Sequence, residues 1–219
     1  MGASRAAIGL AFVVALAGAS VARAQVVERL VNGDFDTDLD GWNVVALGSS
    51  SASWDALDAV DSPSSGSIRT EMVYEGQGNN VNASQCIDVA PGRPYSFGAW
   101  IRRQAGSGLG EGFVRVSWYD GTDCGGSFLS SSDAAAFGLH DTWVLAQLTD
   151  VLAPDTARSA NFRLINLSQD ETTPHVVYFD GAFFVPEPGA ASGGAAALAA
   201  LALLRRRRAS SPPDSLGSC

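Results

Sequence analysis

The chain has 219 residues and no lysine, and its 23 acidic side chains outnumber its 14 arginines, which gives a formal net charge of −9 at pH 7. An acidic surface without basic patches argues against nucleic acids and anionic membranes as partners, and it is compatible with cations and neutral sugars. Residues 25–185 have the length of one domain with a substantial core.

The first 24 residues have the pattern of a secretory signal peptide. Arg5 precedes an apolar run over Ala6–Ala19, and Ala22-Arg23-Ala24 stands directly before Gln25. Signal peptidase accepts small residues at the last and third-last positions before its cleavage point, and the apolar run is too short for a stable membrane span. The pattern predicts a cleaved signal peptide at residues 1–24 and an exported protein. An uncleaved N-terminal anchor is the alternative.

The interior of the chain reads as β-structure throughout. Short segments rich in β-branched and aromatic residues alternate with clusters of Gly, Ser, Asp and Pro, and no stretch shows a helical period. This spacing predicts an all-β domain, an antiparallel β-sandwich or jelly roll. The expected strands are Val26–Val31, Trp42–Leu47, Ser67–Tyr74, Asn82–Val89, Tyr95–Arg103, Phe113–Tyr119, Thr142–Leu152, Asn161–Leu167 and Val176–Val185.

Two of the three cysteines, Cys86 and Cys124, fall inside this domain. Exported proteins fold where disulfides persist, so we expect a Cys86–Cys124 disulfide. Free thiols or an intermolecular bond are the alternatives.

The composition changes after the last expected strand. Pro186-Glu187-Pro188 is followed by an Ala/Leu/Gly run over Gly189–Leu204 and by four arginines, Arg205–Arg208. This three-part order resembles the PEP-CTERM sorting signal of bacterial exported proteins, which an exosortase recognises. The resemblance implies that Pro186, Glu187 and Pro188 are the sorting motif. The apolar run before the arginines predicts transient membrane anchoring through Gly189–Leu204. The Ser/Pro-rich composition of residues 209–219 predicts a disordered tail. A rhombosortase-type signal and a plain tail anchor are alternatives.

The stretch Asn32–Trp42 places four aspartates at alternate positions between Phe35 and Trp42. The succession of Asn32-Gly33-Asp34-Phe35-Asp36, Gly41-Trp42, Tyr95-Ser96-Phe97-Gly98-Ala99-Trp100, Asp141-Thr142-Trp143 and Val177-Tyr178-Phe179-Asp180 resembles carbohydrate-binding modules of the CenC-like, galactose-binding-like jelly-roll type. The resemblance covers most of residues 30–185. Phe35 and Trp42 are expected to be core anchors.

Such modules commonly hold a structural calcium where the first strand meets the last. The matching positions are Asp36 and Asp180, and Asp34 stands beside them in the same acidic loop. Calcium takes six to eight oxygen ligands, which a loop rich in carboxylates supplies. The family more often has a second acid after the position of Asp180, where this chain has Gly181. A solvated acidic turn without an ion is the alternative.

Sugars bind to aromatic faces that also carry polar groups. Alternation in two of the expected strands turns Trp100 and Arg102 outward in one, and Arg115 and Tyr119 in the other. These four residues are the predicted ligand-binding residues, on one outer sheet face. Alternatively, Trp100 packs under a loop.

Residues for catalysis show no recognised grouping. His140 and His175 both stand beside turns, where a solvated histidine is expected, and abundant acids single out no pair for glycosidase chemistry. We therefore expect a non-catalytic module that binds extracellular polysaccharide at the cell surface, outer envelope or extracellular matrix of a bacterium. The alternatives are a structural surface or biofilm-matrix protein with protein partners, and a polysaccharide hydrolase or lyase on a jelly-roll fold.

Overall fold

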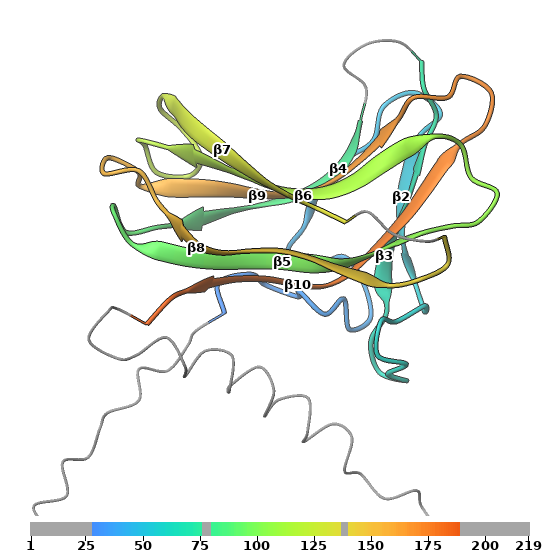
Figure 1. Ribbon diagram of the computed structural model, residues 1–219, viewed down its shortest axis with the longest axis horizontal. Helices are drawn as coiled ribbons and strands as arrows, with labels where there is room; N and C mark the ends of the chain where they lie inside the picture. The colour runs from blue at the N-terminus through green and yellow to red at the C-terminus, as the bar shows by residue number, and fades with distance from the viewer. Residues whose placement is uncertain (1–27, 76–79, 137–139, 189–219) are drawn as a thin grey trace, which may run out of the picture.

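The computed structural model describes residues 28–75, 80–136 and 140–188, which form two antiparallel five-stranded sheets stacked as two layers (Figure 1). These residues contain no helix, and the predicted antiparallel jelly-roll sandwich is confirmed. One sheet has the order β1-β4-β9-β6-β7 and comprises β1 (Asn43–Val45), β4 (Val81–Asp88), β9 (Ser159–Ser168), β6 (Gly110–Tyr119) and β7 (Phe128–Ala135). The other has the order β2-β3-β10-β5-β8 and comprises β2 (Ser51–Asp55), β3 (Ser67–Met72), β10 (His175–Pro186), β5 (Pro94–Arg103) and β8 (Val144–Leu152).

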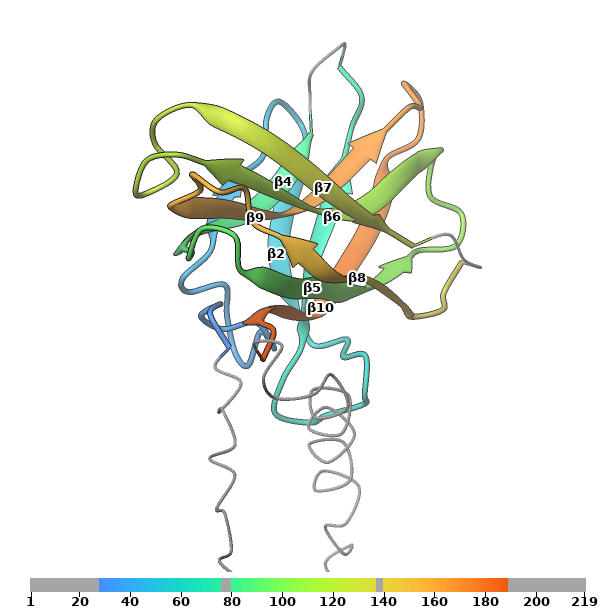
Figure 2. The ribbon, with the colours of Figure 1, turned by 60° about the vertical axis from the view of Figure 1, so that its left-hand side comes forward.

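Alternation along the strands builds the core between the layers. On β5, Phe97 and Ala99 are fully buried and Ile101 nearly so, while Val114 and Val116 on β6 are buried from the other sheet. Tyr95, Trp118 and Phe184 pack as an aromatic cluster, with ring centroids 4.9 to 6.1 Å apart. The layering is clear from a second direction in Figure 2. The inward faces predicted for β5 and β6 are confirmed.

Phe35 and Trp42 are the core anchors that the sequence predicted. Phe35 is fully buried, Trp42 is 8% exposed, and their rings stack with centroids 5.2 Å apart. Trp42 also meets Phe162 of β9 edge-on at 6.0 Å. The acidic loop between them is therefore closed at both ends by aromatic packing.

One expected strand is absent, and two edge strands were not predicted. The described part of Val26–Val31 forms no strand, although the N–H of Arg29 donates to the carbonyl of Phe184 at 3.2 Å. The serine-rich strands β2 and β7 were missed. Both are edge strands with mostly exposed or half-exposed residues. A strand that buries little does not need the apolar alternation that the prediction relied on.

The predicted disulfide is present. Cys86 on β4 is bonded to Cys124, which lies in the connection between β6 and β7, and their Cα atoms are 5.8 Å apart. The bond therefore ties the β6–β7 hairpin across β9 to β4 within one sheet.

The end of β10 includes part of the predicted sorting motif. Pro186 is its last residue and lies opposite Tyr95. The N–H of Glu187 donates to the carbonyl of Pro94 at 2.9 Å, and its side chain accepts from the hydroxyl of Ser96. No helix within the described residues is long and apolar enough to span a membrane. The predicted signal peptide, the Gly189–Leu204 segment and the C-terminal tail lie outside the described residues.

Candidate functional site

The four predicted ligand-binding residues lie on two sheets. Trp100 and Arg102 belong to β5, which pairs with β10 and β8, whereas Arg115 and Tyr119 belong to β6, which pairs with β9 and β7. Their outward side chains therefore point away from each other, on opposite faces of the sandwich. The prediction of one shared face was wrong, because alternation fixes the two faces of a strand but not the sheet to which the strand belongs.

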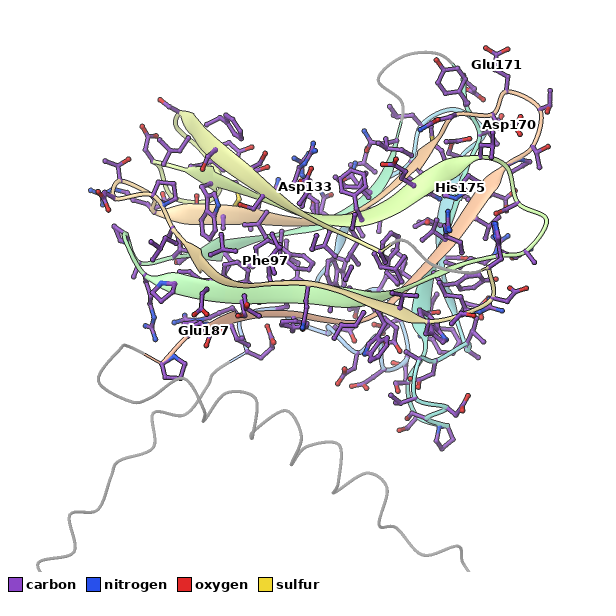
Figure 3. All side chains as sticks on the ribbon, viewed as in Figure 1. Phe97, Asp133, Asp170, Glu171, His175 and Glu187 are labelled. Atoms are coloured by element: carbon purple, nitrogen blue, oxygen red, sulfur yellow. A yellow bond between two sulfur atoms is a disulfide. The ribbon has the colours of Figure 1, made fainter. Side chains whose placement is uncertain are left out.

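The outer face of the β1-β4-β9-β6-β7 sheet carries a band of polar side chains, which we call the arginine face. Arg115 of β6 is in register with Arg163 of β9 on one side and with Asp133 of β7 on the other. The next outward position pairs Ser117 with Asn161. The strands of this sheet dip in the middle and rise towards both ends, so the outer face is concave (Figure 1). Figure 3 shows Asp133 on this outer side, while Phe97 lies between the sheets.

Arg115 and Asp133 form a two-point ion pair. The Nε of Arg115 donates to Oδ1 of Asp133 at 2.6 Å, and its Nη2 donates to Oδ2 at 2.5 Å. This hydrogen-bonded carboxylate raises the pKa of the Arg115 guanidinium. The charge of Arg115 is thus compensated within the protein.

Arg163 has no carboxylate partner of this kind among the described residues. Its Nη2 donates to the hydroxyl of the buried Ser117 at 3.0 Å. Its Nε and the Oδ1 of Asn161 are buried, and neither has a hydrogen-bond partner among the described residues. Partial burial lowers the pKa of Arg163, and the positive charge of Arg115 lowers it further. The centre of the face therefore holds a half-buried cation with unused hydrogen-bonding capacity.

Aromatic side chains stand at both ends of the polar band. Phe113 is buried beneath the guanidinium of Arg115, whose Cζ lies 5.3 Å from the ring centroid. At the other end, Tyr119 and Phe128 meet edge to face at 6.0 Å, and Phe128 is 58% exposed. Exposed aromatic rings next to polar groups match the apolar faces and hydroxyls of sugar rings.

The opposite outer face is occupied by contacts within the protein. Arg102 pairs with Asp141 at 2.7 Å and lies over the ring of Tyr178 with its Cζ 5.4 Å from the centroid. Tyr178 is 8% exposed and meets Trp143 edge-on at 6.5 Å. Trp100 is in register with Asp180 and lies against Gly181. The arginine face is therefore the better candidate for a ligand.

The predicted calcium residues are only partly brought together. Asp180 is 3% exposed, and its two oxygens accept the N–H groups of Ala59 at 2.7 Å and Gly181 at 2.5 Å. Burial raises its pKa to about 7, and the nearby charges of Asp58 and Asp34 add to this.

Asp36, by contrast, is exposed, and its N–H donates to Oδ1 of Asn32. The loop that carries Asp34 and Asp36 is tied to the last strand by the N–H of Ala182, which donates to the carbonyl of Gly33 at 2.9 Å. The structure thus places Asp34 within the electrostatic reach of Asp180, while Asp36 is exposed to solvent.

Asp58, which the sequence analysis missed, is the other buried acid in this region. It is 6% exposed, and it accepts the N–H groups of Val60 and Ser62 and the hydroxyl of Ser65. It lies in a loop without periodicity, so no sequence signal marked it. Carboxylates that crowd one another fit the donor chemistry of a hard cation. No group of three or more His, Cys, Asp or Glu side chains arranged for a metal ion exists among the described residues.

His175 is not the solvated turn residue that was expected. It is 1% exposed at the start of β10, and its Nδ1 lies 2.7 Å from Oδ1 of Asn166. The amide nitrogen of Asn166 donates to the backbone carbonyl of His175 and to Thr70. Burial lowers the pKa of His175 to about 4, so the ring is a neutral part of a polar network that connects the two sheets.

Neither a protein-family model nor a curated protein sequence matches the chain. Solved structures share the fold at low identity. A family 16 carbohydrate-binding module is 20% identical, with 71% of this chain and 98% of that one covered and a TM-score of 0.51. A CBM22-1 xylan-binding domain from Paenibacillus barcinonensis is 13% identical, with 75% and 96% covered and a TM-score of 0.50.

Two further similar structures come from other classes of protein. A cyclase from Fischerella sp. is 15% identical over 75% of this chain and 98% of its own, with a TM-score of 0.51. The enzymatically active domain of a bacteriophage CBA120 tailspike protein is 16% identical over 73% of this chain, with a TM-score of 0.56. The chain spans 21% of that tailspike domain. At these identities the likeness establishes the shared jelly-roll fold.

Proposed function

We propose that the chain is an exported, non-catalytic module that binds polysaccharide on the arginine face. One observation carries this proposal. The same concave sheet face holds aromatic rings and polar atoms that have no hydrogen-bond partner among the described residues. Nε of Arg163 is a donor and Oδ1 of Asn161 is an acceptor, and both are buried without a partner among the described residues. Leaving such groups unpaired costs about 1–3 kcal/mol each, which a hydroxylated ligand would recover if the two side chains turn towards it.

The fold supports the same function. Carbohydrate-binding modules of families 16 and 22 share the two-sheet architecture over nearly their whole length. A module of this kind needs rings to stack on and fixed hydrogen-bonding groups. Tyr119 and Phe128 supply the rings, and Arg163 and Asn161 supply the polar groups.

Binding of the purified chain to a polysaccharide array, followed by titration calorimetry, tests this function. Tyr119→Ala should weaken binding at least tenfold, because it removes the half-exposed ring of the Tyr119–Phe128 pair. Trp100→Ala on the opposite face should leave binding unchanged. If Trp100→Ala weakens binding and Tyr119→Ala does not, the ligand binds to the β2-β3-β10-β5-β8 face instead. Absence of binding across the array would favour the structural matrix role with protein partners.

The enzyme alternative is tested on the same polymers. The cyclase and the tailspike show that this fold also occurs in enzymes. We expect no release of reducing sugar or unsaturated product from any polysaccharide that binds. Release that is lost in a variant of the arginine face would establish the hydrolase or lyase function instead.

We also propose that the acidic region binds a structural calcium ion. Asp180 and Asp58 are buried carboxylates, Asp34 adds charge beside them, and Asp36 lies in the same loop. These residues would supply carboxylate oxygens, the ligands that calcium prefers. A bound cation would offset the mutual repulsion of the acids and tie the loop to β10. This role is structural and separate from the arginine face.

For localisation, we propose delivery to the cell surface, outer envelope or extracellular matrix of a bacterium, with Pro186-Glu187-Pro188 recognised by an exosortase-type enzyme and Gly189–Leu204 as the transient membrane anchor. The described part of the motif is attached to the domain, because Glu187 contacts Pro94 and Ser96. Cell fractionation and the mass of the mature protein test this. Glu187→Ala should leave an uncleaved, membrane-retained chain, whereas an unchanged mass and location would exclude the sorting signal.

A further inference from the structure

The two central arginines of the arginine face differ in how their charge is balanced. Arg115 has a two-point partner in Asp133, whereas no acidic side chain among the described residues lies within ion-pair distance of Arg163. The two arginines are opposite each other on neighbouring strands, so their charges repel. The centre of the face therefore has one more positive than negative charge, in a chain whose net charge is −9.

The other charged side chains on this sheet face are farther away. Glu111 lies two outward positions beyond Arg115 along β6, and Asp88 lies at the end of β4, in register with Ser159. Tyr119 and Asp133 raise the pKa of Arg163, but burial and the charge of Arg115 lower it by more. Neither Glu111 nor Asp88 neutralises the Arg163 guanidinium, and its Nε remains without an acceptor.

We propose that the polysaccharide bound by this face is anionic, and that Arg163 binds the carboxylate of a uronic acid unit. The pairing of Arg115 with Asp133 shows the geometry, because Nε and Nη2 of one guanidinium meet both oxygens of one carboxylate. Arg163 would turn the same two nitrogens to the ligand and release the hydroxyl of Ser117. Asn161, two residues away on the same face, would turn its buried Oδ1 outward to accept a hydroxyl of the same or the neighbouring sugar.

This inference rests on the proposed function and narrows its ligand class. Composition alone was compatible with neutral sugars, because the chain is acidic and lacks a basic patch. A strongly negative chain does not attract polyanions from a distance. Selective binding of an acidic polymer would therefore report a local contact. Replacing the carboxylate with its methyl ester removes the charge and keeps the sugar backbone, which makes the ester a matched control ligand.

The test is titration calorimetry of the purified full chain against polygalacturonate, alginate and glucuronoxylan, each compared with its methyl ester. We expect at least one acid form to bind at least tenfold more tightly than its ester. Arg163→Gln should abolish this preference, and Arg163→Lys, which keeps the charge but lacks the planar fork, should restore only part of it. Arg69→Gln, in an ion pair with Glu71 on the other sheet, should bind like the wild type. The melting temperature of each variant shows whether it is folded.

Each outcome distinguishes the two proposals. Equal affinity for acid and ester forms, or an unchanged preference in Arg163→Gln, overturns the uronate inference and leaves the polysaccharide-binding function standing. Absence of binding to these six polymers and to the neutral polysaccharides of the array overturns both. If Arg163→Gln does not fold, the comparison of acid with ester on the wild-type chain still decides the inference.

Discussion

Arg115 and Asp133 face each other directly across the β6–β7 ladder, and both charged groups of the pair remain partly open to solvent, at 35% and 41% of their side-chain area. The pair offsets the charge of one arginine of the face, while the next arginine, Arg163, has no carboxylate partner among the described residues. Half-exposed ion pairs contribute little to stability. The pair therefore has more influence on what the face binds than on how firmly the sandwich holds together.

Asp133→Asn tests that influence. The unfolding free energy should fall by no more than about 1 kcal/mol, because the pair is solvent-screened. Binding of an acidic polysaccharide should become tighter, because a second arginine becomes available to the carboxylate. Urea unfolding and calorimetry measure the two effects. A large loss of stability with unchanged affinity would show that the pair is structural.

The unfolding free energy should depend on pH through the titration of Asp180. Its pKa rises from 3.8 to about 7 on folding, so the native state keeps a proton that the unfolded chain has already released. Unfolding free energy then decreases as pH rises between about 4 and 7, by up to about 4 kcal/mol in calcium-free buffer. Asp180→Asn should flatten this slope. An identical slope in the variant, measured by urea unfolding at several pH values, would contradict the assignment.

Calcium bound at Asp180 should increase the unfolding free energy. A cation that binds only the folded state at one hundred times its Kd adds about 2.7 kcal/mol. For a chain of this length that corresponds to a rise in Tm of roughly 5–10 °C. Calorimetric melting with and without EDTA measures it at pH 8, where Asp180 is ionised. Asp180→Asn should remove the increase. If EDTA does not change the Tm of the wild type, the calcium site is excluded.

His175 should destabilise the fold in acid. Its pKa falls from 6.5 to about 4 on folding. Between these pH values the unfolded chain binds a proton at His175 that the native state does not bind. The unfolding free energy should decrease by about 3 kcal/mol as pH falls from 6.5 to 4. Asp180 gives the opposite slope over much of this range, so the contribution of His175 is measured as the difference from His175→Asn. Protonation of the ring well above pH 4, seen by NMR, would contradict this prediction.

The sequence was sufficient for the fold class and for the side-chain faces of the central strands, because buried strands must alternate. It was also sufficient for the pairing of Cys86 with Cys124, since these are the two cysteines within the domain. It did not reveal that β5 and β6 belong to different sheets, which depends on how the chain crosses between the layers. This separation divided Trp100 and Arg102 from Arg115 and Tyr119.

The residues that the sequence analysis missed share a physical reason. Asn161, Arg163 and Asp133 are ordinary polar positions on strands, and only their registers with Ser117 and Arg115 create a site. Asp58 lies in a loop that is tied to β10 by the N–H of Ala59, which donates to Asp180. In both regions the informative contact joins segments far apart in the chain, and no local pattern encodes it.

The position of β10 has a consequence for how the chain folds. It is the last strand in sequence, yet it lies in the middle of its sheet, hydrogen-bonded to β3 on one side and β5 on the other. Until residues 175–186 are present, β3 and β5 cannot be joined, and half of the sandwich has no centre. Folding dominated by such distant pairings is slow. A chain that is synthesised N-terminus first therefore cannot complete this sheet until almost the whole domain is present.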